Sequence, residues 1–187
     1  VGKHNNWSIS SNDGKNLLDP SSNPLENTQF LTFLCAIIKG VDEYSDLLRI
    51  SAASAGNDHR LGANEAPPAI ISMFIGDELQ EVLDAIENGT KVKSKNTEFV
   101  IDVDALPNFK KDTTDRNRTS PFAFTGNKFE FRMLGSADSI SCTNVMLNTI
   151  VAEELSQFAD ILEPAKENGT FDTVLNDLLV KTIKEHK

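Results

Sequence analysis

Residues 127–132 constrain the fold most, because charged and aromatic residues alternate there in the order Asn-Lys-Phe-Glu-Phe-Arg. Successive side chains of a β-strand point to opposite faces, so the two phenylalanines would enter a core while the charged residues share the other face. Such a charged face is ordinarily a solvated outer surface. It could instead line a wet cavity in which a carboxylate binds a cation and an arginine binds a carboxylate or a phosphate. The residues of this face are Lys128, Glu130 and Arg132.

A second segment, residues 58–68, places Arg60 five residues before Glu65 in the run Asp-His-Arg-Leu-Gly-Ala-Asn-Glu-Ala-Pro-Pro. Glycine, asparagine and proline are typical of turns. The segment ends an aperiodic stretch over 51–68, and a loop of that length in a compact domain is usually functional. Taken alone, the arginine and the glutamate would also fit an ordinary surface turn.

The spacing of apolar residues predicts the other elements. Apolar residues three or four positions apart indicate a helix over 30–48, which Asn27 or Thr28 could cap. Short apolar or alternating runs indicate strands. We expect strands at 4–10, 69–75 and 99–103, and helices over 79–86 with a stop at Asn88-Gly89, from 139 to a stop at Pro164 and Gly169, and over 171–183.

Composition limits the class of protein. The 187 residues are enough for one domain with a sizeable core. A net charge of −10 without a basic patch argues against nucleic-acid binding, and no apolar stretch approaches the roughly 18 residues of a membrane span. Cys35 and Cys142 lie in apolar helical patterns, so we expect both to be reduced core residues, consistent with a cytoplasmic protein.

Four motifs follow one another in a set order. They are Gly-Lys-His-Asn-Asn-Trp-Ser at 2–8, Arg-Leu-Gly-Ala-Asn-Glu-Ala-Pro at 60–67, Asn-Arg-Thr at 117–119 and Lys-Phe-Glu-Phe-Arg at 128–132, and a helix is expected after Ser139. Each motif is weak alone. In this order they resemble glutamine synthetase, and in particular the long bacterial form called type III.

The resemblance implies an α+β fold, in which an antiparallel curved sheet lines the active site and helices flank it. Residues 1–187 would form the C-terminal part of the catalytic domain. A type III-like insertion is expected at about 77–113 and a helical end at about 139–187. Because family members carry further metal-binding glutamates upstream, the chain would begin inside a longer protein.

The resemblance also implies an activity. The protein would be an ATP-dependent ligase that forms glutamine from glutamate and ammonia through a γ-glutamyl phosphate, with Mg²⁺ or Mn²⁺ as the cofactor. Subunits would associate into stacked hexameric rings. Two alternatives stay open: a related ligase that joins glutamate to another amine, and a non-catalytic homologue that binds nucleotide.

Residue roles follow from the resemblance, motif by motif. His4 and Glu130 match ligands of a metal ion, and Arg60 and Arg132 match arginines that hold substrate glutamate. Glu65 matches the glutamate of a flap that closes over the substrate and accepts a proton.

The remaining matches concern ATP and the transferred phosphate. Arg118 matches an arginine near that phosphate, Ser8 would reach an ATP phosphate, and Lys128 would contact the nucleotide from a place where shorter forms often have arginine. Asn6 stands where shorter forms have a second histidine and would neighbour the nucleotide or the substrate. The chain departs from the shorter family forms at Ala123, where those forms carry another arginine. Arg116 is a candidate replacement because it is near in sequence.

Overall fold

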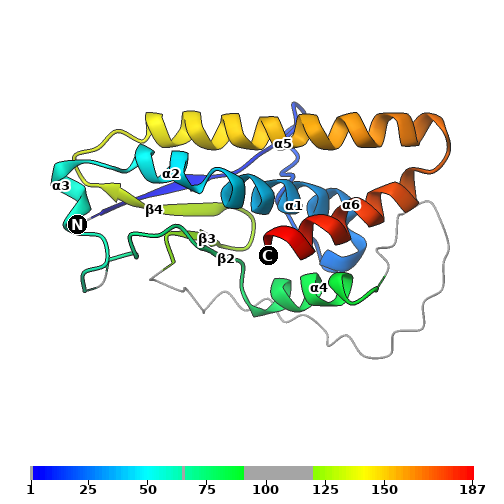
Figure 1. The fold of residues 1–187 in the computed structure, drawn as a ribbon, viewed down its shortest axis with the longest axis horizontal. Coiled ribbons are helices and arrows are strands. Elements are labelled where there is room, and N and C mark those ends of the chain that lie inside the picture. The colour runs from blue at the N-terminus through cyan, green and yellow to red at the C-terminus, as the bar shows by residue number, and fades with distance from the viewer. Residues whose placement is uncertain (1, 65, 91–119) are drawn as a thin grey trace.

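The computed structural model describes residues 2–64, 66–90 and 120–187 (Figure 1). Within them the chain forms four strands, six α-helices and one short 3-10 helix. In chain order these are β1 (Gly2–Trp7), η1 (Pro24–Glu26), α1 (Thr28–Glu43), α2 (Ser45–Ser51), α3 (Ala55–Asp58), β2 (Met73–Phe74), α4 (Asp77–Glu87), β3 (Phe122–Phe124), β4 (Phe129–Gly135), α5 (Ser141–Glu167) and α6 (Phe171–His186).

The described strands form one sheet in the order β1-β4-β3-β2. Strand β4 runs antiparallel to both β1 and β3, whereas β2 pairs with β3 in parallel. The sheet is therefore mixed: the expected antiparallel pairing holds for β1, β4 and β3 but not for β2. The buried strand expected at 69–75 was also wrong in extent. Only Met73 and Phe74 find ladder partners, and Ile70 is 79% exposed.

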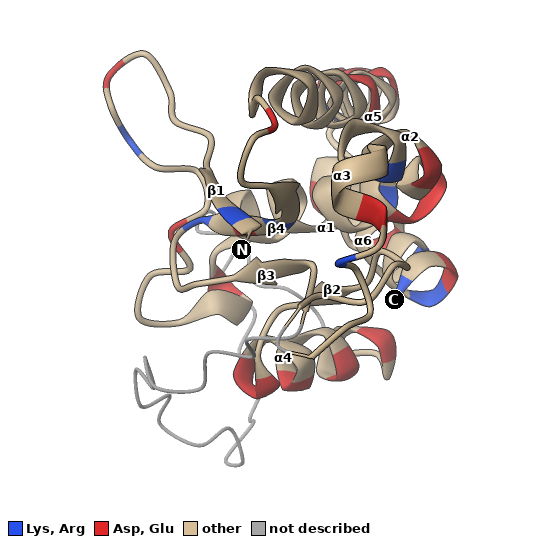
Figure 2. Cartoon of the chain, turned by 90° about the vertical axis from the view of Figure 1, so that its left-hand side faces the viewer, with Lys and Arg blue, Asp and Glu red and all other residues tan. Residues whose placement is uncertain are grey.

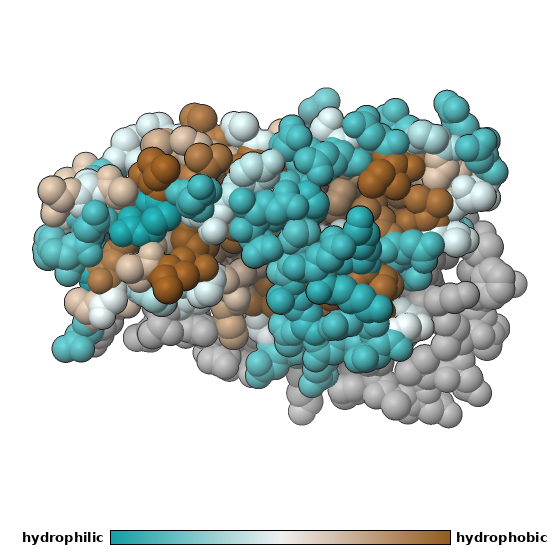
Figure 3. All heavy atoms as spheres, in the orientation of Figure 1, coloured by the Kyte–Doolittle hydropathy of each residue, from teal (hydrophilic) through white to brown (hydrophobic). Residues whose placement is uncertain are grey.

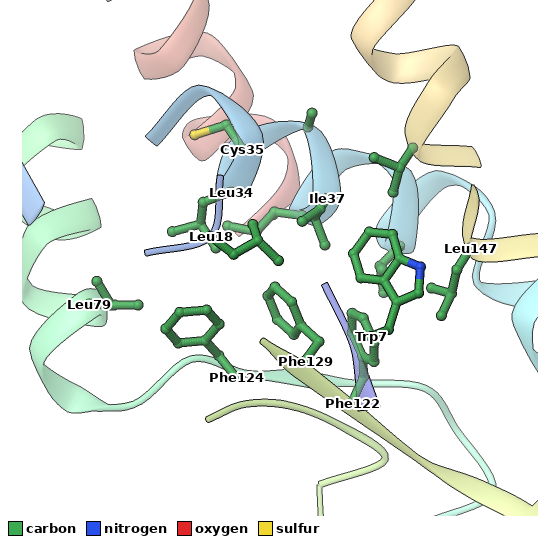
Figure 4. Packing of buried hydrophobic residues seen from close by; sticks show 14 of the residues in the cluster. Trp7, Leu18, Leu34, Cys35, Ile37, Leu79, Phe122, Phe124, Phe129 and Leu147 are labelled. Atoms are coloured by element: carbon green, nitrogen blue, oxygen red, sulfur yellow. The ribbon is translucent and has the colours of Figure 1, made fainter. Parts of the chain in front are cut away.

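Aromatic side chains on one face of the sheet form the centre of the core (Figure 4). The rings of Phe122 and Phe129 stack with their centroids 4.6 Å apart. The ring centroids of Phe124 and of Phe30 in α1 lie 6.0 Å apart, so this face of the sheet packs against that helix. The alternation along residues 127–132 thus places its two phenylalanines in the core, as predicted.

The helix predicted over 30–48 is two helices that meet at Tyr44. The backbone of Tyr44 leaves helical geometry, with φ −120° and ψ 28°, while its N–H still donates to the carbonyl of Gly40. The apolar spacing continues across this break, because Leu48 of α2 also enters the core. Spacing alone therefore could not reveal the break. The cap was predicted correctly, since Asn27 Oδ1 accepts from the N–H of Phe30 at 3.1 Å.

Helix α5 passes through Pro164 and ends three residues later. A proline this near the end of a helix removes a single backbone hydrogen bond, so Pro164 does not stop the helix as predicted. Gly169, with φ 72°, ends it and begins the turn to α6, which is confirmed. The buried stripe of α5 runs through Leu147, Val151 and Phe158.

The two cysteines differ in environment. Cys35 is buried, and burial raises the pKa of its thiol to about 12. Cys142 is exposed, so its expected place in the core was wrong, because the buried stripe of α5 is displaced from the one that we predicted. Both thiols are free, as predicted.

Helix α4 confirms the helix expected at 79–86, and it packs on α6 and η1. Its apolar side is buried, and Figure 2 shows its acidic residues along the outer side. Lys187, after α6, donates to Glu87 at 2.6 Å and also to Asp84. The start of the predicted insertion therefore joins the core. Residues 91–113, with the strand expected at 99–103, lie outside the described residues, and the insertion's limits stay a prediction.

Apolar side chains reach the surface in places. On the face drawn in Figure 3 they gather over α2 and the start of α5, and again between the end of α5 and α6. Ile50 of α2 and Val145 of α5 are among the exposed ones. No helix among the described residues is long and apolar enough to cross a membrane.

A buried ion pair joins α1 to α5. Lys39 Nζ donates to Glu154, whose side chain is 0% exposed, and to Glu43 at 3.0 Å. Within the described residues, Oε1 of Glu154 is buried with no hydrogen-bond partner. Burial disfavours the charged carboxylate more than Lys39 favours it, so the pKa of Glu154 is raised.

The raised pKa predicts a pH-dependent contribution to stability. A folded-state pKa above the unfolded one stabilises the fold below the unfolded pKa, and this stabilisation is lost as the pH rises through the folded pKa. Relative to Glu154→Gln, the wild-type free energy of unfolding should therefore decline as the pH rises from about 4 towards neutrality. Urea unfolding of both proteins over this range measures the difference. If the wild-type free energy of unfolding, relative to that of Glu154→Gln, stays constant or grows as the pH rises, the pKa of Glu154 is not raised in the folded protein.

Candidate functional site

The face of the sheet opposite the aromatic core gathers polar side chains from β1 and β4. Alternation exposes His4 and Asn6 of β1 and also Ser8, while Asn5 and Trp7 are buried on the core side. Asn6 lies directly opposite Glu130 of β4 in the antiparallel ladder. Ala123 of β3 lies on the other side of Glu130.

His4, Glu130 and Arg132 are in contact. Nδ1 of His4 lies 3.6 Å from Oε2 of Glu130, and their side chains are 61% and 17% exposed. Nε of Arg132 donates to that same oxygen at 3.0 Å, and Nη2 lies 2.9 Å from it in an ion pair. Arg132 is only 3% exposed, so the solvated outer face described above fits His4 but not the arginine. The structure thus brings together three residues that the sequence selected.

The His4–Glu130 pair suits part of a divalent metal site. Oxygen ligands lie roughly 2.0–2.2 Å from Mg²⁺ or Mn²⁺, so two adjacent ligand atoms are roughly 3 Å apart, close to the observed 3.6 Å. A neutral imidazole and a carboxylate are acceptable donors for Mn²⁺. The described residues hold no group of three or more His, Cys, Asp or Glu side chains that could bind a metal. The pair would therefore supply only part of such a site.

Arg60 lies just after α3 and is tied to the end of β4. Its Nη2 donates to the carbonyls of Met133 and Leu134, at 2.8 and 3.0 Å, and its Nε donates to Asn57 Oδ1 at 2.9 Å. Its guanidinium also lies against Gly2, where an added Cβ would stand 2.8 Å from Nη1. Three of its five N–H groups are thus engaged within the chain. None of these bonds involves Nη1.

Sequence reasoning missed Asn57, which organises this corner. The side chain is 1% exposed and donates to the carbonyls of Ala52 and Met133, both at 2.7 Å, while it accepts from Arg60. Its position in the aperiodic Ala/Ser/Gly/Asn segment gave no signal, because asparagine there fits a turn. A hollow of about 220 Å³ opens beside it, lined by Ser54, Gly56, Asn57, His59, Arg60, Gly135, Ser136, Ala137 and Asp138.

The other candidates are less informative. The hydroxyl of Ser8 donates to Asn16 at 2.9 Å, which links β1 to the following turn. Lys128 is half-buried, and its carbonyl accepts from the N–H of Thr125 in the turn before β4. Glu65, Arg116 and Arg118 lie outside the described residues, so their roles stay predictions.

Comparison with known proteins gives a consistent set of relatives, although no protein-family model matches the chain. A type-3 glutamine synthetase of Dictyostelium discoideum is 48% identical over 186 residues, 99% of this chain and 25% of that protein. A glutamine synthetase of Butyrivibrio fibrisolvens is 63% identical over 129 residues, 69% of this chain and 18% of that protein. One of Bacteroides fragilis is 46% identical over 172 residues, 90% of this chain and 24% of that protein. The chain thus spans a quarter or less of the length of these curated relatives.

Replacement of Asn57 tests the corner around Arg60. Asn57→Ala leaves two buried carbonyls and the Nε of Arg60 without their partner, so we expect a loss of roughly 1–3 kcal/mol in the free energy of unfolding. His59→Ala, at an exposed neighbouring position, is the control and should change stability by less than about 0.5 kcal/mol. Chemical denaturation measures both. Equal stability of the two variants would show that the amide network contributes little.

Proposed function

Because the chain belongs to the glutamine synthetase family and spans only part of its relatives' length, we propose that the protein containing it joins ammonia to glutamate at the expense of ATP. The side-chain carboxylate of glutamate would first take the terminal phosphoryl group of ATP. Ammonia would then displace phosphate from the resulting γ-glutamyl phosphate. The observation that carries this proposal is the contact of His4, Glu130 and Arg132 on the polar face of the sheet.

The reaction sets demands that this cluster can meet. Phosphates and a carboxylate must approach despite their like charge, which calls for divalent cations and arginines. A Mg²⁺ or Mn²⁺ ion, when bound, would offset the negative charge of the phosphates. His4 and Glu130 would hold it from β1 and β4, with further ligands from outside this chain. Arg132 supports the arrangement because its hydrogen bond and ion pair with Oε2 orient the carboxylate of Glu130.

Substrate glutamate would be held by Arg132 and Arg60. A guanidinium carries five N–H donors and a positive charge, so one that is partly engaged within the chain can still donate to a substrate carboxylate. In Arg60 only Nη1 keeps both of its N–H groups outside the bonds to β4 and Asn57, so we propose that it takes one carboxylate oxygen through that nitrogen. Its anchoring would then fix the position of the substrate relative to β4.

The remaining residue roles are proposed from the motif matches. Glu65 would close over the bound glutamate, keep water from the acyl phosphate and accept a proton from the amine adduct. Arg118 would stabilise the negative charge that develops on the transferring phosphoryl group. Lys128, Ser8 and Asn6 would face the nucleotide. Ser8 and Asn6 are exposed on the same face as His4, which is compatible with that role.

Two other functions compete with this proposal. A ligase that joins glutamate to a different amine would use the same phosphorylation step, and the present residues do not fix the amine. A non-catalytic homologue would have no need for a metal ligand pair, and the 3.6 Å contact of His4 with Glu130 disfavours that alternative.

We further propose that the complete subunits associate into stacked hexameric rings, with active sites between neighbours. Exposed apolar side chains such as Ile50, Ile140 and Val145 support contacts beyond this chain. The rest of the polypeptide or a neighbouring subunit would cover them.

The first test is an assay of phosphate release by the full-length protein. We expect release from ATP that requires glutamate, ammonium and Mg²⁺ or Mn²⁺ together, because each takes part before or at the displacement step. Omission of each component in turn provides the control. Release that ignores ammonium but responds to another amine would support the related ligase, and no release from assembled protein would support the non-catalytic homologue.

Glu130→Gln tests the metal role with little change of shape. The amide can still accept from Arg132 but supplies no charge to a cation, so turnover should decline at least about 100-fold while assembly is unchanged. Glu163→Ala, which removes an exposed carboxylate from α5, is the control and should retain full turnover. Light scattering and the phosphate assay measure assembly and turnover. Wild-type turnover in Glu130→Gln would exclude the proposed ligand.

A further inference from the structure

Two asparagines of α5 hold strand β1 from the core side. Nδ2 of Asn5 donates to Oδ1 of Asn144 at 2.8 Å. The indole N–H of Trp7 donates to Oδ1 of Asn148 at 2.9 Å. Asn5 is 4% and Trp7 8% exposed, so both donors are withdrawn from water. Figure 4 shows the indole beside Leu147 of the same helix.

The spacing of these bonds fits strand and helix to each other. Asn5 and Trp7 are two residues apart, roughly 6.6 Å along a strand. Asn144 and Asn148 are four residues apart, roughly 6 Å along a helix and on one face of it. Both bonds therefore form together at one axial position of β1 along α5. A shift of one residue, roughly 3.3 Å, would break both.

Besides these two bonds, β1 has its ladder with β4 and the bond that Lys3 Nζ donates to the carbonyl of Asp138. It pairs with β4 alone among the described strands, and its register with β4 shifts between Lys3 and Asn5, at the position of His4. Over this step β1 advances two residues while β4 advances three, from Leu134 to Phe131, so the extra residue of the bulge lies in β4 and His4 faces it without a ladder partner. The ladder therefore determines the direction of His4 less firmly than that of Asn6, which is paired with Glu130.

Helix α5 can hold β1 in place because α5 is itself fixed by buried contacts. Leu147 and Ile150 are buried in the core. The hydroxyl of Thr143, which is fully buried, lies 2.9 Å from that of Ser51 in α2. These contacts fix the first three turns of α5 to the helical layer.

We propose that Asn144 and Asn148 are positioning residues for the candidate metal site. They hold β1 at the register at which His4 and Glu130 can bind one divalent cation, although neither asparagine lies on the polar face of the sheet. The inference rests on the proposed metal role of His4. It means that two residues of α5, which do not contact the metal, help to position one of its ligands.

The test is direct Mn²⁺ binding to the full-length protein, measured by calorimetry and by the electron paramagnetic resonance of free Mn²⁺. His4→Ala first defines the binding step that depends on this histidine. Asn144→Leu and Asn148→Leu remove the acceptor oxygen at nearly constant volume, and we expect each to weaken that step by about tenfold or more. Asn144→Asp and Asn148→Asp keep an acceptor oxygen and should restore wild-type binding.

Two further variants separate positioning from stability. Trp7→Phe removes the indole donor and leaves no buried acceptor unpaired, because Asn148, whose Oδ1 accepted the bond, is exposed and can bond to water. It should weaken Mn²⁺ binding even where a leucine variant fails to fold. Thr149→Ala, an exposed change on the same helix, should leave binding unchanged.

The inference is overturned if the leucine variants and Trp7→Phe melt at lower temperature but bind Mn²⁺ like the wild type, or if the aspartates fail to restore binding. Unchanged Mn²⁺ binding in His4→Ala would overturn it together with the metal role of His4. Glutamine formation by the wild-type protein is measured separately, so failure of the proposed function is distinguishable from failure of this inference.

Discussion

The burial of Phe129 and Phe131 against the helices is the constraint on which the rest of the structure depends. Full burial of a phenylalanine side chain is worth roughly 1.5–3 kcal/mol relative to leaving it exposed. The contact of Glu130 with Arg132 on the other face contributes far less, because desolvation of such a pair offsets much of its attraction. Since side chains alternate, a one-residue slip of β4 would bury the charges and expose the rings. The aromatic core therefore fixes where the polar site stands.

Local patterns predicted the elements whose apolar period is uninterrupted. Helices α4 and α6, the cap at Asn27 and the two faces of β4 were all confirmed. The failures have separate physical causes. The stripe of α1 continues into α2, so the break at Tyr44 left no mark in the spacing. Pro164 is tolerated because its missing N–H affects the end of a helix, and the run at 69–75 lacks partners for most of its length.

The candidate site was predictable where it depends on one strand pair and less so where it depends on tertiary contacts. Alternation and motif order were enough to select His4, Glu130 and Arg132, which the structure brings into contact. They could not show that the guanidinium of Arg60 is largely engaged by backbone carbonyls. They also missed Asn5 and Asn57, although a polar residue that alternates with tryptophan on a core face is a usable signal. Such residues contribute by fixing the positions of others.

The long sequence separation of the contacts around β1 determines when that strand can fold. Lys3, Asn5 and Trp7 bond to residues 135, 139 and 141 positions later in the chain. At 5–20 residues per second, a ribosome would need roughly 7–30 s to make the partners of a strand that it has already released. Until then the edge of β1 that pairs with β4 keeps its backbone groups free, open to wrong partners. Its sequence, Gly-Lys-His-Asn-Asn-Trp, contains a single large apolar side chain, which limits its tendency to aggregate during that interval.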